Sequence, residues 1–195
     1  GLQAGFLLAV TYLFWDKARS AQTDMTLCFF IMLSLTAFEA FRAGDAAPRR
    51  AGLLFWASGA LAVLTKGPVG ILLPLGIGVL TLAFDRDLRR LARFAPLSGP
   101  LVFAAILACW IVPANLWNPE VYTVGAALKE HFVERAIYGM HHVQPFWYYA
   151  MVLPPVLMPW TLLVPGALLA IWRRKDGAAR FLLIIIFFVL LFFSV

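Results

Sequence analysis

The residues best suited to chemistry are few, and they gather in three short stretches of an apolar chain. Asp24 precedes one apolar run, Lys66 lies in a Thr-Lys-Gly-Pro turn between two others, and all three histidines fall at 131–142. A lysine in apolar surroundings is stable when it meets an anion, so Lys66 is a candidate for binding a phosphate or a carboxylate. A lysine that reaches out to lipid headgroups is the alternative, and spacing alone does not separate the two.

Asp24 has a structural explanation as well as a chemical one. A carboxylate at the N-terminal edge of a helix accepts hydrogen bonds from free backbone N–H groups and meets the positive end of the helix dipole. Position alone favours this N-cap role over a catalytic one.

The histidines suggest a metal site or a polar helix face. His131 or His142 with Glu130 or Glu134 would supply ordinary metal ligands. Their spacing fits no standard zinc signature. The alternative to a metal site is a solvated helix on which the charges at 129–135 pair with one another. The aromatic residues that follow would then form a belt at the membrane interface.

The composition defines the class of protein that must position these residues. Apolar residues make up 63% of the 195 positions, the mean hydropathy is +0.86 and 13% of residues are charged, which is too apolar for a soluble domain. The apolar stretches are too long and unbroken for barrel strands, so the sequence predicts an all-α, polytopic transmembrane helical bundle. Cys28 and Cys109 lie inside apolar stretches, which argues against a disulfide or a thiolate metal site.

The apolar runs predict seven spans, at 1–15, 25–41, 52–65, 68–84, 97–113, 146–171 and 181–195. Eleven of the sixteen basic residues fall in three alternate loops, which are therefore expected to be cytoplasmic. These residues are Arg42, Arg49, Arg50, Arg86, Arg89, Arg90, Arg93, Arg173, Arg174, Lys175 and Arg180. The net charge of +6 thus reflects the orientation of the loops in the membrane, and no nucleic-acid partner is expected.

Two spans and both chain ends have further consequences. The spans beside Lys66 hold roughly 14 to 17 residues, fewer than the roughly 20 that cross a bilayer, which suggests that Lys66 lies below the outer surface. The span 146–171 contains four prolines and is expected to be kinked or broken, as helices that line cavities often are. Both ends lie in apolar runs without a signal peptide, so residues 1–195 are expected to be part of one transmembrane domain.

Several short motifs occur in a defined order along the chain. They are Ala-Arg-Ser-Ala-Gln-Thr-Asp-Met at 18–25, Leu-Thr-Lys-Gly-Pro at 64–68, Lys-Glu-His at 129–131, and Pro-Phe-Trp-Tyr-Tyr at 145–149 followed by Met-Pro-Trp at 158–160. Together they resemble the bacterial branch of the protein O-mannosyltransferase-like glycosyltransferases. This branch includes the aminoarabinose transferase of lipid A and related lipopolysaccharide glycosyltransferases.

The resemblance implies a GT-C type fold and the transfer of a sugar from a polyprenyl-phosphate donor to a lipid or protein acceptor. It places the active site on the periplasmic side of the bacterial inner membrane. Asp24 matches the family's second active-site aspartate, Lys66 the membrane-edge lysine of its Thr-Lys-Gly turn, and His131 a histidine that helps form a metal or polar site. The other residues that we assign to binding the lipid phosphate or the sugar are Arg19, Arg135, His142 and Tyr148.

Two departures from the family pattern limit this transfer of roles. The first periplasmic loop, with the acidic residue taken as the catalytic base, would lie before Gly1, so the chain alone is expected to be inactive. Glu134 stands where relatives tend to carry the phosphate-binding arginine, and Arg135 follows it. In this scheme fixed cations stabilise the charge on the departing phosphate and Asp24 orients hydroxyl groups. The resemblance implies no uniformly required cofactor, and a divalent metal ion near His131 would fit.

Transport is the main alternative to glycosyl transfer. Kinked helices and an intramembrane lysine would also serve a transporter or flippase for a lipid-linked or anionic substrate. The sequence shows no internal repeat, and its charges lie to one side rather than at the midplane. A noncatalytic assembly subunit is a third alternative, and it predicts that Asp24 and Lys66 tolerate neutral replacement.

Overall fold

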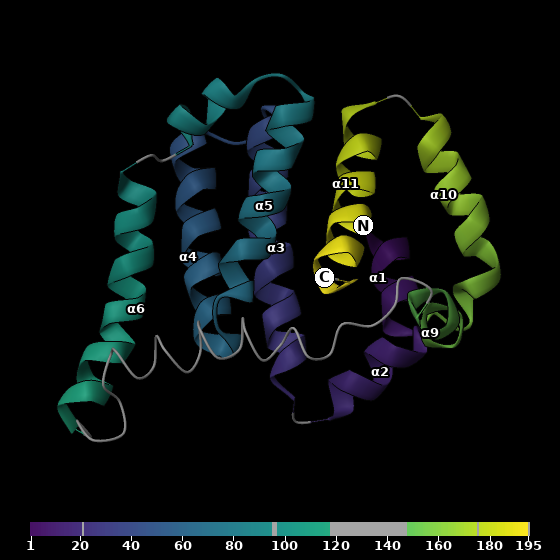
Figure 1. Cartoon of the computed structure of the whole chain (residues 1–195), viewed down its shortest axis with the longest axis horizontal. Coiled ribbons are helices and arrows are strands. Elements are labelled where there is room, and N and C mark those ends of the chain that lie inside the picture. The colour runs from purple at the N-terminus through teal and green to yellow at the C-terminus, as the bar shows by residue number, and fades with distance from the viewer. Residues whose placement is uncertain (21, 95–96, 118–147, 175, 195) are drawn as a thin grey trace. The chain divides into compact units, whose positions relative to one another are not determined.

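A computed structural model describes residues 1–20, 22–94, 97–117, 148–174 and 176–194. Every regular element within these ranges is an α-helix or a 3₁₀-helix, which confirms the all-α prediction. The chain divides into two compact units, one formed by Gly1–Met25 with Val143–Val195 and the other by Thr26–His142. Each unit is described by itself, and Figure 1 labels their helices.

The second unit consists of helices that alternate in direction. They are α3 (Thr23–Ala43), which enters the unit at Thr26, α4 (Pro48–Lys66), α5 (Val69–Phe84), the 3₁₀-helix η1 (Leu88–Arg93) and α6 (Ser98–Trp117). Helix α4 packs against both α5 and α6. The alternation brings Arg42, at the end of α3, close to Asp85, which follows α5, so these two loops lie at one end of the unit.

Glycines allow the two tight turns of this unit. Gly44 after α3 has φ +86° and Gly67 after α4 has φ +85°, a backbone region that residues with a Cβ atom rarely adopt. The Gly67 N–H donates to the Val63 carbonyl at 2.7 Å, which closes the last turn of α4. Pro48 is the first residue of α4, where its missing N–H needs no partner inside the helix, and Pro68 is the N-cap of α5, one residue before that helix begins.

Aromatic side chains form the centre of the second unit. Phe38 of α3, Phe55 of α4 and Phe94 after η1 are 1%, 3% and 5% exposed. Their ring centroids lie 5.2 to 6.5 Å apart, with Phe94 edge-on to the other two rings. Ser34 of α3 adds a hydrogen bond to the Phe55 carbonyl at 3.1 Å, so polar and apolar contacts hold α3 against α4.

Small residues bring α4 and α5 into close contact. A Cβ atom built on Gly70 would lie 2.6 Å from the Val63 nitrogen and 2.7 Å from the Ala62 Cβ, so no larger residue fits there. Close backbone approach through glycine and alanine is typical of helices that associate within a membrane, where van der Waals packing replaces the hydrophobic driving force.

The first unit is built from shorter helices. They are α1 (Leu2–Ala9), α2 (Tyr12–Arg19), α9 (Tyr148–Val156), the 3₁₀-helix η4 (Trp160–Leu163), α10 (Val164–Arg173) and α11 (Gly177–Ser194). The prediction of a kinked or broken proline-rich span is confirmed, because this stretch divides into α9, η4 and α10. Asp176 caps α11 by accepting a hydrogen bond from the Ala179 N–H at 2.7 Å.

The prediction of one span over 1–15 is wrong, because the helix is interrupted at Val10 and Thr11. The interruption frees the Leu7 carbonyl, which accepts hydrogen bonds from the Thr11 hydroxyl at 2.8 Å and from the Trp160 indole N–H at 3.0 Å. The Tyr12 N–H donates to the Met158 carbonyl at 3.0 Å. Two interrupted helices therefore satisfy each other's backbone groups, as an apolar solvent requires.

Three of the described helices are long and apolar enough to cross a membrane: α3, α6 and α11. Val69–Phe84 and Trp160–Arg173 are apolar but shorter. Helix α4 has 19 residues, more than the expected 14, because it begins at Pro48 and includes the arginine pair. Leu101, Trp110 and Leu116 of α6 are 66% to 74% exposed, which suits a surface in contact with lipid.

Candidate functional site

Lys66 is the last residue of α4 and its side chain is exposed. It lies at the end of the second unit at which α3 enters, opposite to Arg42. Helix α5 starts three residues later and runs for 16 residues, about 24 Å, which is less than the roughly 30 Å of a bilayer's hydrocarbon core. The short α5 favours a place for Lys66 at or below the membrane edge, whereas the extra residues of α4 extend its opposite end.

A helix terminus offers Lys66 a structural role as well. A cation at a C-terminus interacts favourably with the negative end of the helix dipole. The neighbouring Thr65 hydroxyl donates to the Leu61 carbonyl at 2.8 Å, so it is engaged within α4. The assignment of Lys66 to anion binding stays a prediction.

Asp24 is half-buried in the first turn of α3, where it is the second helical residue. Gln22 occupies the position before the helix, so the expectation that Asp24 is the N-cap is off by two residues. A carboxylate in the first turn still interacts favourably with the positive helix end. This placement is compatible with both roles that the sequence left open for Asp24.

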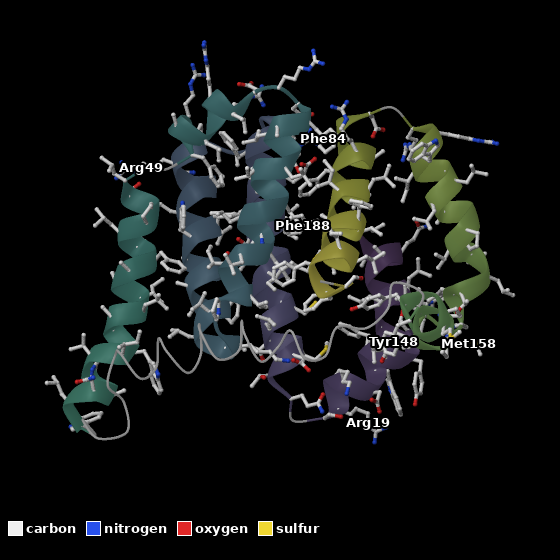
Figure 2. The ribbon with its side chains drawn as sticks, viewed as in Figure 1. Arg19, Arg49, Phe84, Tyr148, Met158 and Phe188 are labelled. Atoms are coloured by element: carbon white, nitrogen blue, oxygen red, sulfur yellow. The ribbon has the colours of Figure 1, made fainter. Side chains whose placement is uncertain are left out.

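Arg19 and Tyr148 both belong to the first unit, and Figure 2 labels them. The guanidinium of Arg19, the last residue of α2, lies 4.5 Å from the centroid of the Trp15 ring, a cation–π contact. Tyr148 begins α9, is 39% exposed and stands edge-on to Tyr149 at 5.6 Å. The Tyr149 hydroxyl donates to the Phe193 carbonyl at 2.7 Å, which fastens the start of α9 and so fixes the place of Tyr148.

The structure therefore places four of the seven candidate residues on defined elements. Arg19, Asp24 and Tyr148 belong to the first unit and Lys66 to the second, so their assembly into one site stays a prediction. The other three, His131, Arg135 and His142, lie outside the described residues. Among the residues that the structure places, no group of three or more His, Cys, Asp or Glu side chains could hold a metal ion. The metal near His131 also stays a prediction.

An ion-pair cluster at the opposite end of the second unit was not predicted. Arg42 donates to both carboxylate oxygens of Glu39 at 2.6 Å and to Asp85 at 3.3 Å, and its side chain is only 11% exposed. Charge spacing could have suggested the Glu39 pair, which is three residues apart on one helix. Arg90 adds a pair with Asp87 at 2.7 Å and donates to the Arg42 carbonyl at 3.1 Å. These contacts join the ends of α3, α5 and η1.

Fold and composition together define a polytopic helical membrane protein. The chain is 32% identical over 98% of its length to the undecaprenyl phosphate-alpha-4-amino-4-deoxy-L-arabinose arabinosyl transferase of Aeromonas salmonicida. It is 30% identical over its whole length to the enzyme of the same name from Pseudomonas aeruginosa, and 29% identical to an uncharacterized protein of Aquifex aeolicus over 97% of the chain. In each case it spans 36% of the relative's length. The chain is therefore homologous to a segment of these transferases.

This homology confirms the family resemblance that the ordered motifs suggested. No family model matches the chain, and no solved structure matches it. The homology covers both units, so the motifs at 18–25, 64–68 and 158–160 all lie within the aligned segment.

Proposed function

We propose that the chain is part of a membrane glycosyltransferase that moves a sugar from a polyprenyl-phosphate donor to lipid A, another lipopolysaccharide lipid or a protein. The observation that carries this proposal is the 32% identity over 98% of the chain to a transferase named for an undecaprenyl-phosphate-linked sugar. The apolar exposed helices fit this role, because a long isoprenoid carrier is available only within the membrane.

Lys66 is the proposed anchor for the donor's phosphate. Cleavage of the bond between the sugar C1 and the phosphate oxygen leaves negative charge on the departing lipid phosphate. A fixed ammonium in a partly dehydrated site stabilises that charge more in the transition state than in the bound donor, and it transfers no proton. Arg135 would act on the same phosphate, with Arg19, His142 and Tyr148 as further contacts to the phosphate or the sugar.

Asp24 is proposed to orient hydroxyl groups of the acceptor or the sugar. Deprotonation of the acceptor needs a carboxylate base, which the family resemblance places outside this chain. His131 could hold a divalent ion that supplies additional positive charge beside the phosphate. The steps assigned to Lys66 and Asp24 do not depend on this ion.

The proposed location is a bacterial inner membrane, with the Lys66 end facing the periplasm. The support comes from Arg42, Arg49 and Arg50 and the basic residues of 86–93, which lie at the other end of the second unit. Loops rich in arginine remain on the cytoplasmic side during insertion.

Transfer of label tests the proposed activity. The full-length protein is placed in membranes with radiolabelled polyprenyl-phosphate sugar, and label is followed into lipid and protein acceptors. We expect Lys66→Ala to lower the initial rate by roughly 100-fold, the effect of removing one stabilising group from a charged transition state, and Lys66→Arg to restore part of it. Asp24→Asn should also lower the rate, whereas Arg50→Gln, a charge change at the opposite end, should not.

The outcomes distinguish the alternatives. If the Lys66→Ala and Asp24→Asn variants both transfer label at the normal rate, the site assignment is wrong. If the wild type transfers no label from any of a panel of donors, the enzyme proposal is wrong. The meeting of two interrupted helices in the first unit keeps a transporter or flippase as the second candidate, because such breaks recur at transport sites. That function predicts movement of the lipid-linked sugar between leaflets without a change in its covalent structure.

A further inference from the structure

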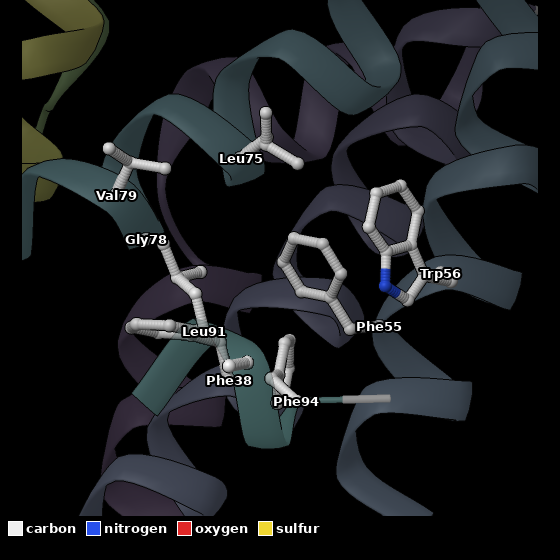
Figure 3. A pocket seen from close by; sticks show the side chains of 9 residues that line it. Phe38, Phe55, Trp56, Leu75, Gly78, Val79, Leu91 and Phe94 are labelled. Carbon is white, nitrogen blue, oxygen red and sulfur yellow. The ribbon is translucent and has the colours of Figure 1, made fainter. Parts of the chain in front are cut away.

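The end of the second unit that carries Arg42 contains two hollows, and the stretch 86–94 contributes to the lining of both. One is a cavity of about 300 Å³ between α3, α4, α5 and η1, shown in Figure 3. Its lining is apolar and includes Phe38, Phe55, Trp56, Val79, Leu91 and Phe94. The other is a shallow depression whose lining includes Arg86, Asp87, Leu88 and Arg89. Neither hollow includes a residue of the candidate site for sugar transfer.

The cavity suits a hydrocarbon chain. Its volume is at the lower end of the roughly 300–1,000 Å³ of small-molecule sites, and its walls are aromatic and aliphatic. The indole nitrogen of Trp56 is buried and makes no hydrogen bond within the described ranges. The nitrogen lies against Gly99 of α6 and is not open to the cavity, so a ligand there would meet mainly apolar side chains.

The depression suits an anion. Asp87 is paired with Arg90 at 2.7 Å, so it does not neutralise the two arginines of the lining. Arg86 and Arg89 are exposed and form no ion pair with any residue placed by the structure. Two positive charges, with the Asp87 carboxylate already paired to Arg90, are complementary to a phosphate group.

The 3₁₀-helix between the hollows has the character of an interfacial segment. Leu88 and Leu91 of η1 are 50% and 37% exposed, although each has an arginine beside it in the sequence. Apolar side chains at the level of the acyl chains with arginines at the level of the headgroups are typical of helices at a membrane surface. At about 2 Å per residue η1 is roughly 12 Å long, so one lipid molecule can reach both hollows.

We propose that this end of the second unit binds one anionic phospholipid, with an acyl chain in the Trp56 cavity and the phosphate on Arg86 and Arg89. The anionic class follows from Arg86 and Arg89, which form no ion pair among the described residues, because the headgroup of a zwitterionic lipid carries no net charge. The bound lipid fills a cavity that would otherwise lack contacts, and it joins η1 to the aromatic centre of the unit.

Quenching of Trp56 fluorescence tests this site. The purified full chain is placed in phosphatidylcholine nanodiscs that contain a small fraction of lipid with dibrominated acyl chains, either phosphatidylglycerol or phosphatidylcholine. The difference between wild type and Trp56→Phe isolates the signal of Trp56. We expect half-maximal quenching at a mole fraction of phosphatidylglycerol at least about fivefold lower than that of phosphatidylcholine, roughly the factor contributed by one arginine near a membrane surface.

Three variants sharpen the result. Arg86→Gln with Arg89→Gln should remove the preference for phosphatidylglycerol, while the control Arg49→Gln with Arg50→Gln, exposed arginines that line neither hollow, should keep it. Ala92→Phe, which fills the cavity from an exposed position, should abolish quenching by both lipids while helicity is unchanged.

The opposite results would overturn the site. Equal quenching by the two lipids in the wild type, or the same loss of preference in both arginine pairs, would refute a headgroup site on Arg86 and Arg89. Quenching that persists in Ala92→Phe would refute the acyl chain in the cavity. No quenching, together with an oligomer that Ala92→Phe dissociates, would show that a second copy of the chain fills the cavity instead of a lipid.

Discussion

The two units of the chain hold their helices together in different ways. In the second unit, buried rings and small residues dominate, with Phe38, Phe55 and Gly70 in the helix contacts. In the first unit, Ala179, Phe181 and Ile184 of α11 are the buried apolar residues that the structure describes, and hydrogen bonds between interrupted helices connect distant segments. A chain with an apolar exposed surface can thus be stabilised by side-chain packing in one unit and by hydrogen bonds to free backbone groups in the other.

Phe38→Ala should produce the largest loss and would sharpen this comparison. The ring is 1% exposed and contacts the rings of Phe55 and Phe94, so its removal leaves a large cavity. We expect a loss of about 3–5 kcal/mol in the free energy of unfolding, measured by denaturant titration in micelles. The control is Phe29→Ala on the same helix, where the ring is 61% exposed and the loss should be small. Equal losses would show that packing does not dominate in this unit.

Arg42→Gln should have an intermediate effect. The guanidinium bonds to Glu39 and Asp85, and its removal leaves two carboxylates that are 25% and 21% exposed close together without their cation. Hydrogen bonds to charged groups contribute about 1.5–3 kcal/mol, and we expect a loss in that range in the same titration. Arg49→Gln, which breaks no ion pair in the described part of the chain, should change stability by less than about 0.5 kcal/mol. If both variants lose the same free energy of unfolding, the ion pairs of Arg42 do not stabilise the unit.

Trp160→Phe should have the smallest effect, confined to the first unit. It removes the donor to the Leu7 carbonyl and leaves the bond from the Thr11 hydroxyl, so we expect a loss of about 0.5–1.5 kcal/mol. Amide hydrogen exchange should become faster around Val10 and Tyr12 and remain unchanged in α4. The control is Trp172→Phe, an indole that is 74% exposed and donates to no carbonyl among the described residues. Faster exchange spread evenly over both units would show that this hydrogen bond does not stabilise the first unit alone.

The sequence predicted the elements that depend on local signals. Apolar runs bounded by arginines, glycines and prolines gave α3 and α5 to within a few residues, and the Thr-Lys-Gly-Pro turn gave the position of Lys66 at a helix end. Proline content gave the interruption between α9 and α10. These features follow from residues that are close in the chain, so periodicity and breakers are sufficient to find them.

The features that the sequence did not predict depend on distant partners. Nothing in residues 1–15 indicates that the helix is interrupted at Val10. The Leu7 carbonyl that the interruption frees accepts a hydrogen bond from Trp160, which is 153 positions away in the sequence. The bond between Arg42 and Asp85 likewise joins residues 43 positions apart. For the candidate site, the sequence predicted that Lys66 and Asp24 lie at helix ends, which the structure confirms. Whether Asp24 meets Lys66 is a question of tertiary contact that spacing cannot answer.

The exchange of bonds between Leu7, Tyr12 and the 158–160 segment has a consequence for biosynthesis. A ribosome makes the acceptor at Leu7 long before the donor at Trp160, and all of the second unit emerges between them. Until residues 158–160 are made, the Leu7 carbonyl has the Thr11 hydroxyl as its donor within this unit, and the Tyr12 N–H lacks the Met158 carbonyl. The α1–α2 segment therefore reaches its final hydrogen bonding only after the whole of the second unit has been synthesised.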